Sequence, residues 1–243
     1  MTNDNKEQEL SDTTDTAIAY STCYVQPFSE VFNDDCIQVM KRYPDKFFDL
    51  AVVDPPYGLG MGATLNVNSN VKFIDKDWDK EIPPDEYFIE LQRVSKNQIV
   101  WGGNYFPFLW KTGCKDFIFW NKLNHHENRS DGEMAWTSFN GLAKYVEYMW
   151  DGNRYGTKGN IKGVGQPTIR IHPTEKPVFL YEWIFQHYAS KGNLILDTHL
   201  GSGSSRIAAH KAGLSFVGCE IDKDYFDAQE KRFKLFESQK RLF

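Results

Sequence analysis

Four consecutive residues combine a carboxylate, two rigid rings and an aromatic side chain: Asp54, Pro55, Pro56 and Tyr57. Each proline fixes φ near roughly −65° and has no N–H to donate, so nearby carbonyl oxygens can be left facing a ligand. With each residue type at roughly 5%, this run turns up by chance in about one chain of this length in a thousand. The run therefore predicts a stiffly held acid beside a ligand, and the alternative is a rigid turn without a chemical role.

A second run, Gly201 to Gly203, follows an apolar segment near the C-terminus. Glycines there let the backbone approach a ligand, and an acid about 20 residues further on can accept hydrogen bonds from ribose hydroxyls. Glu220 is 19 residues after Gly201, and Asp222 is its rival, unless Asp222 caps the following helix. Arg206 stands where a dinucleotide site would have its third glycine. The pattern therefore favours another adenosine-containing cofactor over NAD, and a plain strand-to-helix turn is the alternative.

The elements that must position these two runs are buried strands. Residues 47–53 are β-rich without polar alternation after Asp49, as expected for a parallel strand covered on both faces. Residues 193–197 read as a second strand, followed by a helix that ends near 211–213. Open α/β sheets place ligands at the carboxyl ends of their strands, so we expect both runs at one edge. A further strand over 215–222 and an amphipathic helix through Tyr225, Phe226, Phe233 and Phe236 complete a βαβα unit.

Together these motifs resemble those of amino-methylating DNA methyltransferases, which carry an Asp-Pro-Pro-Tyr type catalytic motif and a glycine-rich S-adenosylmethionine loop. The sequence His-Pro-Thr-Glu-Lys-Pro at 172–177 is similar to the segment before that family's cofactor helix, and the motif order corresponds to its β arrangement. Residues 101–106 and 117–122 resemble its later strand ends, so the resemblance covers about 30 to 240. It implies an α/β chain with a Rossmann-like methyltransferase fold: a mostly parallel central sheet with helices on both faces.

The resemblance also implies a reaction, methyl transfer from S-adenosylmethionine to the N6 amino group of adenine in DNA. That nitrogen is a poor nucleophile because its lone pair is delocalised into the ring. Asp54 would accept one amino hydrogen and a carbonyl of the Pro55-Pro56 turn the other, which aims the lone pair at the methyl group. The target nucleotide must be flipped out of the stack, and Tyr57 would stack on the displaced base.

Other assignments stay open at this point. Asp in the first motif position favours adenine over cytosine N4 by family association, and cytosine N4 is the nearest rival. RNA or protein-amide methylation is less favoured, because those relatives usually have Asn in place of Asp54. A non-catalytic DNA- or nucleotide-binding module that kept the fold is a hypothesis of another class. Whether a restriction enzyme accompanies the chain in a restriction-modification pair is not encoded in these motifs.

The resemblance assigns cofactor roles with differing alternatives. Asp197 would orient the loop or approach the cofactor's amino group, and the methionine end would meet Thr174 and Lys176, for which helix capping and a surface charge are the alternatives. Asp34 and Asp35 would lie near the adenine, with a solvated turn as the alternative. The full expected set is Asp34, Asp35, Thr174, Lys176, Asp197, His199, Gly201, Ser202, Gly203 and Glu220.

His199 is a departure from the family pattern, because phenylalanine usually stands two residues before the first loop glycine, and Thr198 replaces the usual proline. A neutral imidazole could stack near the cofactor, whereas a protonated one would repel the sulfonium. The sequence alone leaves a plain polar loop residue as an equal alternative.

A segment rich in glycine and basic residues, 151–170, occupies the place of the family's target-recognition region. Its cations suit phosphate contacts: Arg154, Lys158, Lys162 and Arg170. The segment is short, so we expect a short recognition sequence or help from a second subunit in a homodimer. Lys231, Arg232, Lys234, Lys240 and Arg241 could contribute, although a solvated helix face explains them equally well.

Composition limits the other possibilities. With 243 residues, 41% hydrophobic and 25% charged, the chain suits one large domain over 17–243. Residues 1–16 hold five acids and one lysine, which accounts for −4 of the net charge of −5, and we expect this acidic tail to be disordered. The same residues lack the basic-then-apolar order of a secretory signal, so we expect a cytoplasmic protein. Its four cysteines predict no disulfide framework, and we expect no metal, because even the adjacent pair His125 and His126 lacks ligand spacing.

Two further regions carry weaker predictions. The segment between Gly58 and Asp79 has glycines, asparagines and few apolar residues, which favours a loop closing over the flipped base, with disorder as the alternative. Trp101 and Trp120 could line the base pocket or belong to the plain core.

Overall fold

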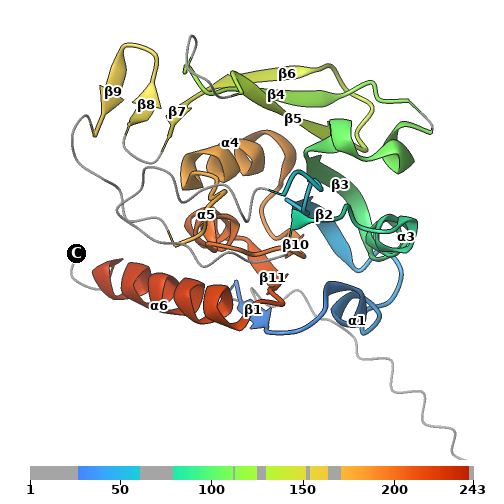
Figure 1. Ribbon diagram of the computed structural model, residues 1–243. Coiled ribbons are helices and arrows are strands. Elements are labelled where there is room, and N and C mark those ends of the chain that lie inside the picture. Colours follow the sequence, from blue (N-terminus) through green and yellow to red (C-terminus); the bar gives the residue numbers. More distant parts are fainter. Residues whose placement is uncertain are drawn as a thin grey trace, which may run out of the picture.

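The computed structural model describes residues 27–60, 79–111, 113–124, 130–151, 154–163 and 171–240. Within these ranges, eight strands form one sheet in the order β1-β11-β10-β2-β3-β5-β4-β6 (Figure 1). The acidic tail lies outside the described residues. The predicted α/β class is confirmed, because helices and strands alternate along most of the chain.

Five neighbouring strands run parallel and form one half of the sheet. β2 (Phe48–Val53) pairs with β10 (Leu194–Asp197) on one side and with β3 (Ser95–Trp101) on the other. β11 (Ser215–Cys219) lies between β10 and the edge strand β1 (Ser29–Phe32). The other half holds β5 (Gly132–Thr137), which runs antiparallel to β3 and to β4 (Phe117–Asn121), and β6 (Lys144–Glu147), parallel to β4. The sheet is therefore mostly parallel, with β5 reversed against its two neighbours.

The sheet is covered on both faces because its central strands are apolar on both. In β2, Leu50 and Val52 pack on the face covered by α4 (Val178–Tyr188) and α5 (Ser204–Lys211). Ala51 and Val53 pack on the opposite face, against α1 (Cys36–Met40) and α3 (Asp85–Val94). Burying each larger aliphatic side chain contributes about 1.5–3 kcal/mol. This two-sided burial explains the unbroken apolar run that the sequence shows before Asp54.

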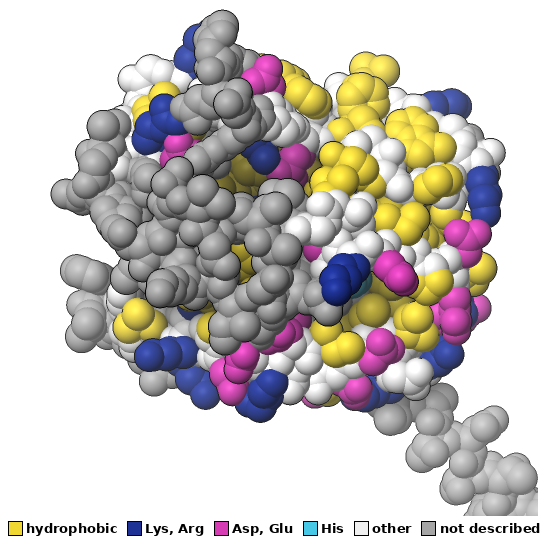
Figure 2. All heavy atoms as spheres, in the orientation of Figure 1, with side chains coloured by type: hydrophobic (Ala, Val, Ile, Leu, Met, Phe, Trp, Pro, Cys, Tyr) yellow, Lys and Arg dark blue, Asp and Glu magenta, His cyan; other side chains and the backbone are white. Residues whose placement is uncertain are grey.

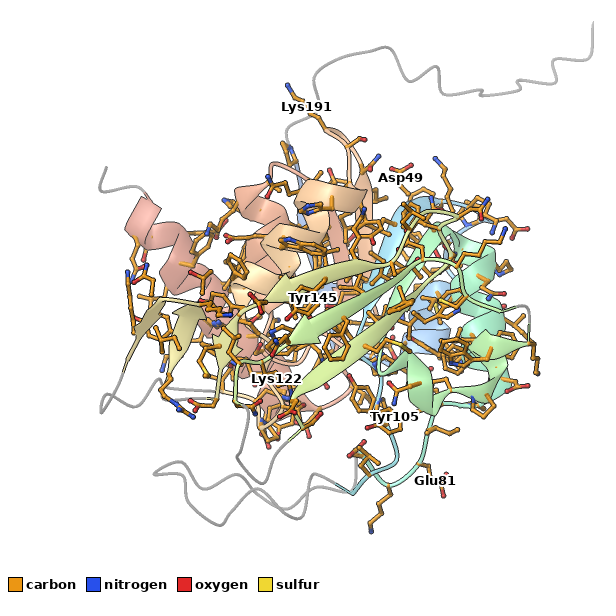
Figure 3. The ribbon with its side chains drawn as sticks, turned by 90° about the horizontal axis from the view of Figure 1, so that it is seen from above. Asp49, Glu81, Tyr105, Lys122, Tyr145 and Lys191 are labelled. Carbon is orange, nitrogen blue, oxygen red and sulfur yellow. The ribbon has the colours of Figure 1, made fainter. Side chains whose placement is uncertain are left out.

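The carboxyl ends of the parallel strands form a single edge of the sheet. Ile195 and Leu196 of β10 stand beside Leu50 and Ala51 of β2, so the two strands end side by side. In Figure 3, Lys122, just after β4, and Tyr105 lie at this edge, whereas Asp49 lies at the opposite one. We call this border, formed by the chain just after β1, β11, β10, β2, β3 and β4, the carboxyl edge.

The last helix, α6 (Lys223–Lys240), packs along α5 at the bottom of the molecule in Figure 1. Asp222 Oδ1 accepts hydrogen bonds from the backbone nitrogens of Asp224 and Tyr225 at 2.9 and 3.2 Å, so Asp222 caps this helix. Arg206 of α5 lies 3.9 Å from the centre of the Phe233 ring. Arg206, which stands in place of a third glycine, therefore packs α5 against α6.

A small antiparallel sheet of β7 (Met149–Trp150), β8 (Tyr155–Thr157) and β9 (Asn160–Lys162) stands apart from the main sheet, at the upper left of Figure 1. Its β8–β9 hairpin carries Lys158 in the turn and Lys162 at the end of β9, both exposed.

Several simpler predictions can also be compared with the structure. Trp101 and Trp120 are 0% and 2% exposed and belong to the core, and Lys176 Nζ lies 5.4 Å from the centre of the Trp101 ring. Cys36, Cys114 and Cys219 are free thiols. Across the part of the chain that the structure describes, no helix combines the length and apolar character needed to cross a membrane.

Candidate active site at the carboxyl edge

Asp54 follows directly after β2 and has both carboxylate oxygens engaged. Its Oδ1 accepts a hydrogen bond from the Tyr57 hydroxyl at 2.6 Å. Its Oδ2 lies 2.5 Å from Nζ of Lys176, which precedes α4. The carboxylate is thus held from two sides before any ligand binds.

Lys176 is buried, with 4% of its side chain exposed, and each of its three ammonium hydrogens has a partner. Besides Asp54, Nζ lies 3.1 Å from Oε2 of Glu133 and 3.0 Å from the Tyr57 hydroxyl. Glu133, near the start of β5, also pairs with Lys122 just after β4. Two carboxylates and two ammonium groups therefore offset each other's charge, which is the condition for burying them.

These contacts set the charge of each group. Burial alone would raise the pKa of Glu133, but Lys176 and Lys122 lower that pKa to about 2. Burial opposes the charge of Lys176, yet Asp54 and Glu133 raise its pKa above the ordinary value. Burial raises the pKa of Asp54, and Lys176 partly offsets that effect. Glu133 and Lys176 are therefore charged at neutral pH, while the pKa of Asp54 stays above its ordinary value.

The Tyr57 ring is packed as well as hydrogen-bonded. It stacks on Tyr105 with ring centres 5.0 Å apart and planes 19° apart. Gly102, with φ +66°, lies so close that a Cβ there would be 2.2 Å from the Tyr57 ring. The predicted stacking of Tyr57 on a flipped base stays a prediction, with one ring face covered by Tyr105 in this structure.

The proline turn keeps its carbonyl oxygens available. Asp79, 3% exposed, accepts hydrogen bonds from the backbone nitrogens of Tyr57 and Gly58 at 2.7 and 3.1 Å. No residue in the described ranges donates to the carbonyl oxygen of Pro55 or Pro56. Residues 61–78, which would form the predicted closing loop, lie outside those ranges.

The glycine turn follows β10, the strand next to β2. Gly201 and Gly203 have φ values of +50° and +72°, which favour glycine. The Gly201 nitrogen donates to Glu220 Oε2 at 2.8 Å, and the Asp222 nitrogen donates to Oε1 at 2.9 Å. Ser202 is buried, and its hydroxyl lies 3.0 Å from that of Ser204. Glu220 thus shapes the turn by accepting a backbone N–H on each of its carboxylate oxygens.

Asp197 is the last residue of β10, and His199 stands between it and the glycine turn in the chain. Asp197 accepts hydrogen bonds from the His199 nitrogen at 3.0 Å and from the Ser205 hydroxyl, and burial raises its pKa to about 7. Burial lowers the pKa of His199 to about 4. The ring centres of His199 and Tyr87 lie 5.3 Å apart in an edge-on contact. His199 is therefore neutral at neutral pH, which removes the repulsion that a charged imidazole would exert on a sulfonium.

The remaining expected cofactor residues have local partners. His172 lies over the glycine turn, 3.6 Å from the position of a Cβ at Gly201, and 3.2 Å from the Thr174 hydroxyl. Asp35 accepts a hydrogen bond from the Gln38 nitrogen at 3.0 Å, which caps α1, and Asp34 pairs with Arg42. Capping explains Asp35, while both acids still follow β1 at the carboxyl edge.

The predicted DNA-binding cations do not form one group. Arg154 pairs with Asp151, 2.7 Å from Nε to Oδ2, whereas Lys158 and Lys162 are exposed on the hairpin. Arg170 and Arg241 lie outside the described residues, as do His125, His126 and the side chain of Lys240. On the visible described part of the face in Figure 2, lysines and arginines are interspersed with acids rather than gathered into one basic surface.

Sequence reasoning missed two residues of this site, Glu133 and Asp79. Glu133 enters the carboxyl edge from the amino end of the reversed strand β5, and Asp79 comes from the far end of the loop after Tyr57. No local pattern marks either residue, because each acts on a group distant in the sequence.

Comparison with known proteins agrees with this geometry. A family model described as DNA methylase matches residues 102–231. Type II methyltransferase M2.DpnII of Streptococcus pneumoniae is 26% identical over 83% of this chain and 88% of its own length. Type II methyltransferase M2.LlaDCHI of Lactococcus lactis subsp. cremoris is 24% identical over 82% of this chain and 86% of its own length.

Two solved structures show the same fold. The M1.HpyAVI complex with SAM has a TM-score of 0.56 and 18% identity, over 85% of this chain and 99% of that one. The cytosine-N4-specific PvuII DNA methyltransferase has a TM-score of 0.53 and 14% identity, over 86% of this chain and 89% of that one. The predicted Rossmann-like methyltransferase fold is therefore confirmed. Because the matching family model covers more than half of the sequence, this chain belongs to the DNA methylase family of amino-methylating enzymes.

Proposed function

We propose that the chain transfers the methyl group of S-adenosylmethionine to the exocyclic N6 amino group of adenine in DNA. The observation that carries this proposal is the pairing of β2 with β10, with Leu196 beside Ala51. It brings the acid at 54 and the glycine turn to neighbouring positions on the carboxyl edge. A methyl donor held by one can thus meet an amine held by the other.

The residues at this edge fit the cofactor in charge and shape. The glycine turn offers backbone to a close ligand, and Glu220, which holds that turn, is the acid that we propose to meet the ribose hydroxyls. Glu220 is an acid and His199 is neutral, so the edge suits a ligand with a positive sulfonium. S-adenosylmethionine supplies an activated methyl group here, and the expected roles of Thr174 and Lys176 at its methionine end remain proposals.

The chemistry of this chain's residues is positioning. Asp54 accepts one hydrogen of the target amine, and the carbonyl oxygen of Pro55 or Pro56 accepts the other. Holding both hydrogens makes the nitrogen more tetrahedral and directs its lone pair at the methyl group. The methylated nitrogen then sheds one proton, for which Asp54, with its raised pKa, is a nearby acceptor.

The target base is tested by digesting methylated DNA to nucleosides and analysing them by mass spectrometry. We expect N6-methyladenine, because Asp stands first in the catalytic motif. N4-methylcytosine would overturn that part of the proposal, and the PvuII enzyme shows that the same fold is found in a cytosine-N4-specific protein. A charged imidazole at His199 would favour the non-catalytic alternative by repelling the cofactor, and its lowered pKa of about 4 argues against that charge.

For DNA contact, the exposed β8–β9 hairpin is the best-placed described element. Replacing Lys158 and Lys162 together with alanine should weaken duplex binding about tenfold at moderate salt. It should also reduce the slope of log affinity against log salt by about 2, as expected for two lost phosphate contacts. Fluorescence anisotropy over a salt series measures both.

The matched control removes Lys96 and Lys191 near the opposite edge of the sheet, where Figure 3 places Lys191. Its affinity and slope should stay at the wild-type values. A hairpin variant that behaves like this control would contradict the role of the hairpin. A hairpin this small suits a short recognition sequence or help from a second subunit in a homodimer. We further propose a cytoplasmic location and a place in a restriction-modification pair. We also infer one domain over 17–243.

A further inference from the structure

Asp54 is occupied in a way that conflicts with its proposed task. Oδ1 accepts from the Tyr57 hydroxyl and Oδ2 pairs with Lys176 at 2.5 Å. An amino nitrogen that gains positive charge during methyl transfer is repelled by an ammonium group on the same carboxylate oxygen. The lysine must therefore shift for Asp54 to act with full effect.

The shift cannot be toward water, because only 4% of the Lys176 side chain is exposed. A buried ammonium needs another acceptor, since leaving it unpaired costs several kcal/mol. Glu133 already lies 3.1 Å from Lys176 Nζ. Its own position is fixed by Lys122 and by strand β5, and its pKa of about 2 keeps it ionised at working pH.

We propose that Glu133 is a positioning residue that takes over the Lys176 ammonium when the target base enters, leaving Asp54 Oδ2 to accept an amino hydrogen. The inference rests on the proposed methyl transfer. The ion pair between Lys176 and Asp54 Oδ2 is given up for closer pairing with Glu133, and no covalent bond breaks and no proton is transferred.

Such a two-position lysine accounts for the composition of the cluster. Without a base, Lys176 neutralises the half-buried Asp54 carboxylate, whose other partner, the Tyr57 hydroxyl, carries no charge. With a base present, Glu133 keeps the lysine paired while Asp54 turns to the amine. A single carboxylate could not serve both states.

The first test compares kcat of wild type, Glu133→Gln and Glu133→Gln with Lys176→Met, using labelled methyl transfer to unmethylated DNA. Each rate is taken at the alkaline plateau of that protein's own pH profile. Glu133→Gln should lower kcat about 100-fold, with KM for cofactor and DNA within about twofold, because Lys176 stays on Asp54. The double variant with Lys176→Met should have a kcat at least about tenfold higher than Glu133→Gln alone, because no ammonium then blocks Asp54.

The second readout is the acidic limb of the kcat profile, which we expect to respond to the protonation of Asp54. The groups facing Asp54 are Lys176, Glu133 and Tyr57, with Tyr181 of α4 and Asp197 of β10 nearby. Lys176 lowers the pKa of Asp54 and Glu133 raises it. Lys176→Met should therefore move the limb to higher pH and Glu133→Gln to lower pH, opposite shifts that a general loss of packing would not produce.

A matched control removes another carboxylate–lysine pair, Asp49 and Lys96, whose atoms lie 2.6 Å apart. Figure 3 places Asp49 at the edge opposite Lys122. Asp49→Asn with Lys96→Met should leave kcat within about twofold, because the pair contacts neither the amine nor the cofactor region.

A double variant as slow as Glu133→Gln alone would overturn the inference. Acidic limbs that shift in the same direction in Lys176→Met and Glu133→Gln would overturn it as well. If the glutamine variant does not fold, Glu133→Asp replaces it, and its smaller loss must also recover with Lys176→Met. Counting every methylated base keeps the inference independent of adenine or cytosine. Wild type that transfers no methyl to DNA would overturn the proposed function itself, and the inference with it.

Discussion

Replacing Asp54 with alanine should lower methyl transfer about 1,000-fold or more while leaving cofactor affinity within about twofold. In the proposed reaction the carboxylate aligns the amine, whereas the glycine turn proposed to bind the cofactor follows the neighbouring strand, β10. The measurements are labelled methyl transfer to DNA and calorimetric titration with S-adenosylmethionine.

Asp54→Asn is the control for this prediction, because it keeps an oxygen acceptor of nearly the same size but loses the charge beside Lys176. It should retain more activity than alanine and much less than wild type. Normal turnover in Asp54→Ala would remove the proposed role, and loss of cofactor binding would show that the two parts of the site are not separable.

Replacing Gly102 with alanine should lower kcat about 100-fold, because the new methyl group cannot coexist with the present position of Tyr57. A Cβ at Gly102 would lie 2.2 Å from the Tyr57 ring, so the ring must move. That movement also breaks the 2.6 Å hydrogen bond from its hydroxyl to Asp54. Misplacing a positioning group by about 1 Å costs on the order of 100-fold in rate.

Gly113→Ala is the matched control, since Gly113 has φ +77° and a Cβ added there would meet no atom within 4 Å. Both substitutions carry the left-handed backbone cost of about 1–2 kcal/mol, so both should lower the melting temperature. Only Gly102→Ala should lose activity per folded molecule. Equal kcat values for the two variants would show that Tyr57 need not be held where it is.

The apolar runs in the sequence were sufficient to predict the central strands of the fold, because such runs indicate which segments are buried. Residues 47–53 are apolar on both faces, and β2 (Phe48–Val53) is indeed covered by helices on both. Asp222 shows the limit of such patterns, since ribose binding and helix capping predict the same residue, and the structure shows capping of α6. Arg206 stands where the dinucleotide pattern has a glycine, and in the structure its side chain packs on Phe233 of α6.

The charge cluster could not be predicted in the same way. Lys176 was expected at the cofactor's methionine end, and the structure places its nitrogen 2.5 Å from Asp54, more than a hundred residues earlier in the chain. Glu133 reaches the same edge because β5 runs antiparallel to its neighbours. The residues around Glu133 do not indicate the direction of that strand in the sheet. Long-range pairing of charges depends on topology, which no local window contains.

The claim on which the account depends is that methyl donor and amine meet at the carboxyl edge, between the turns that follow β2 and β10. Ultraviolet crosslinking of methyl-labelled S-adenosylmethionine to the wild-type chain, followed by mapping of the labelled peptide, tests it directly. The account predicts label in the segments that hold Asp54 to Tyr57 or Asp197 to Gly203. Label confined to the opposite edge, around Asp49 and Lys96, would contradict it.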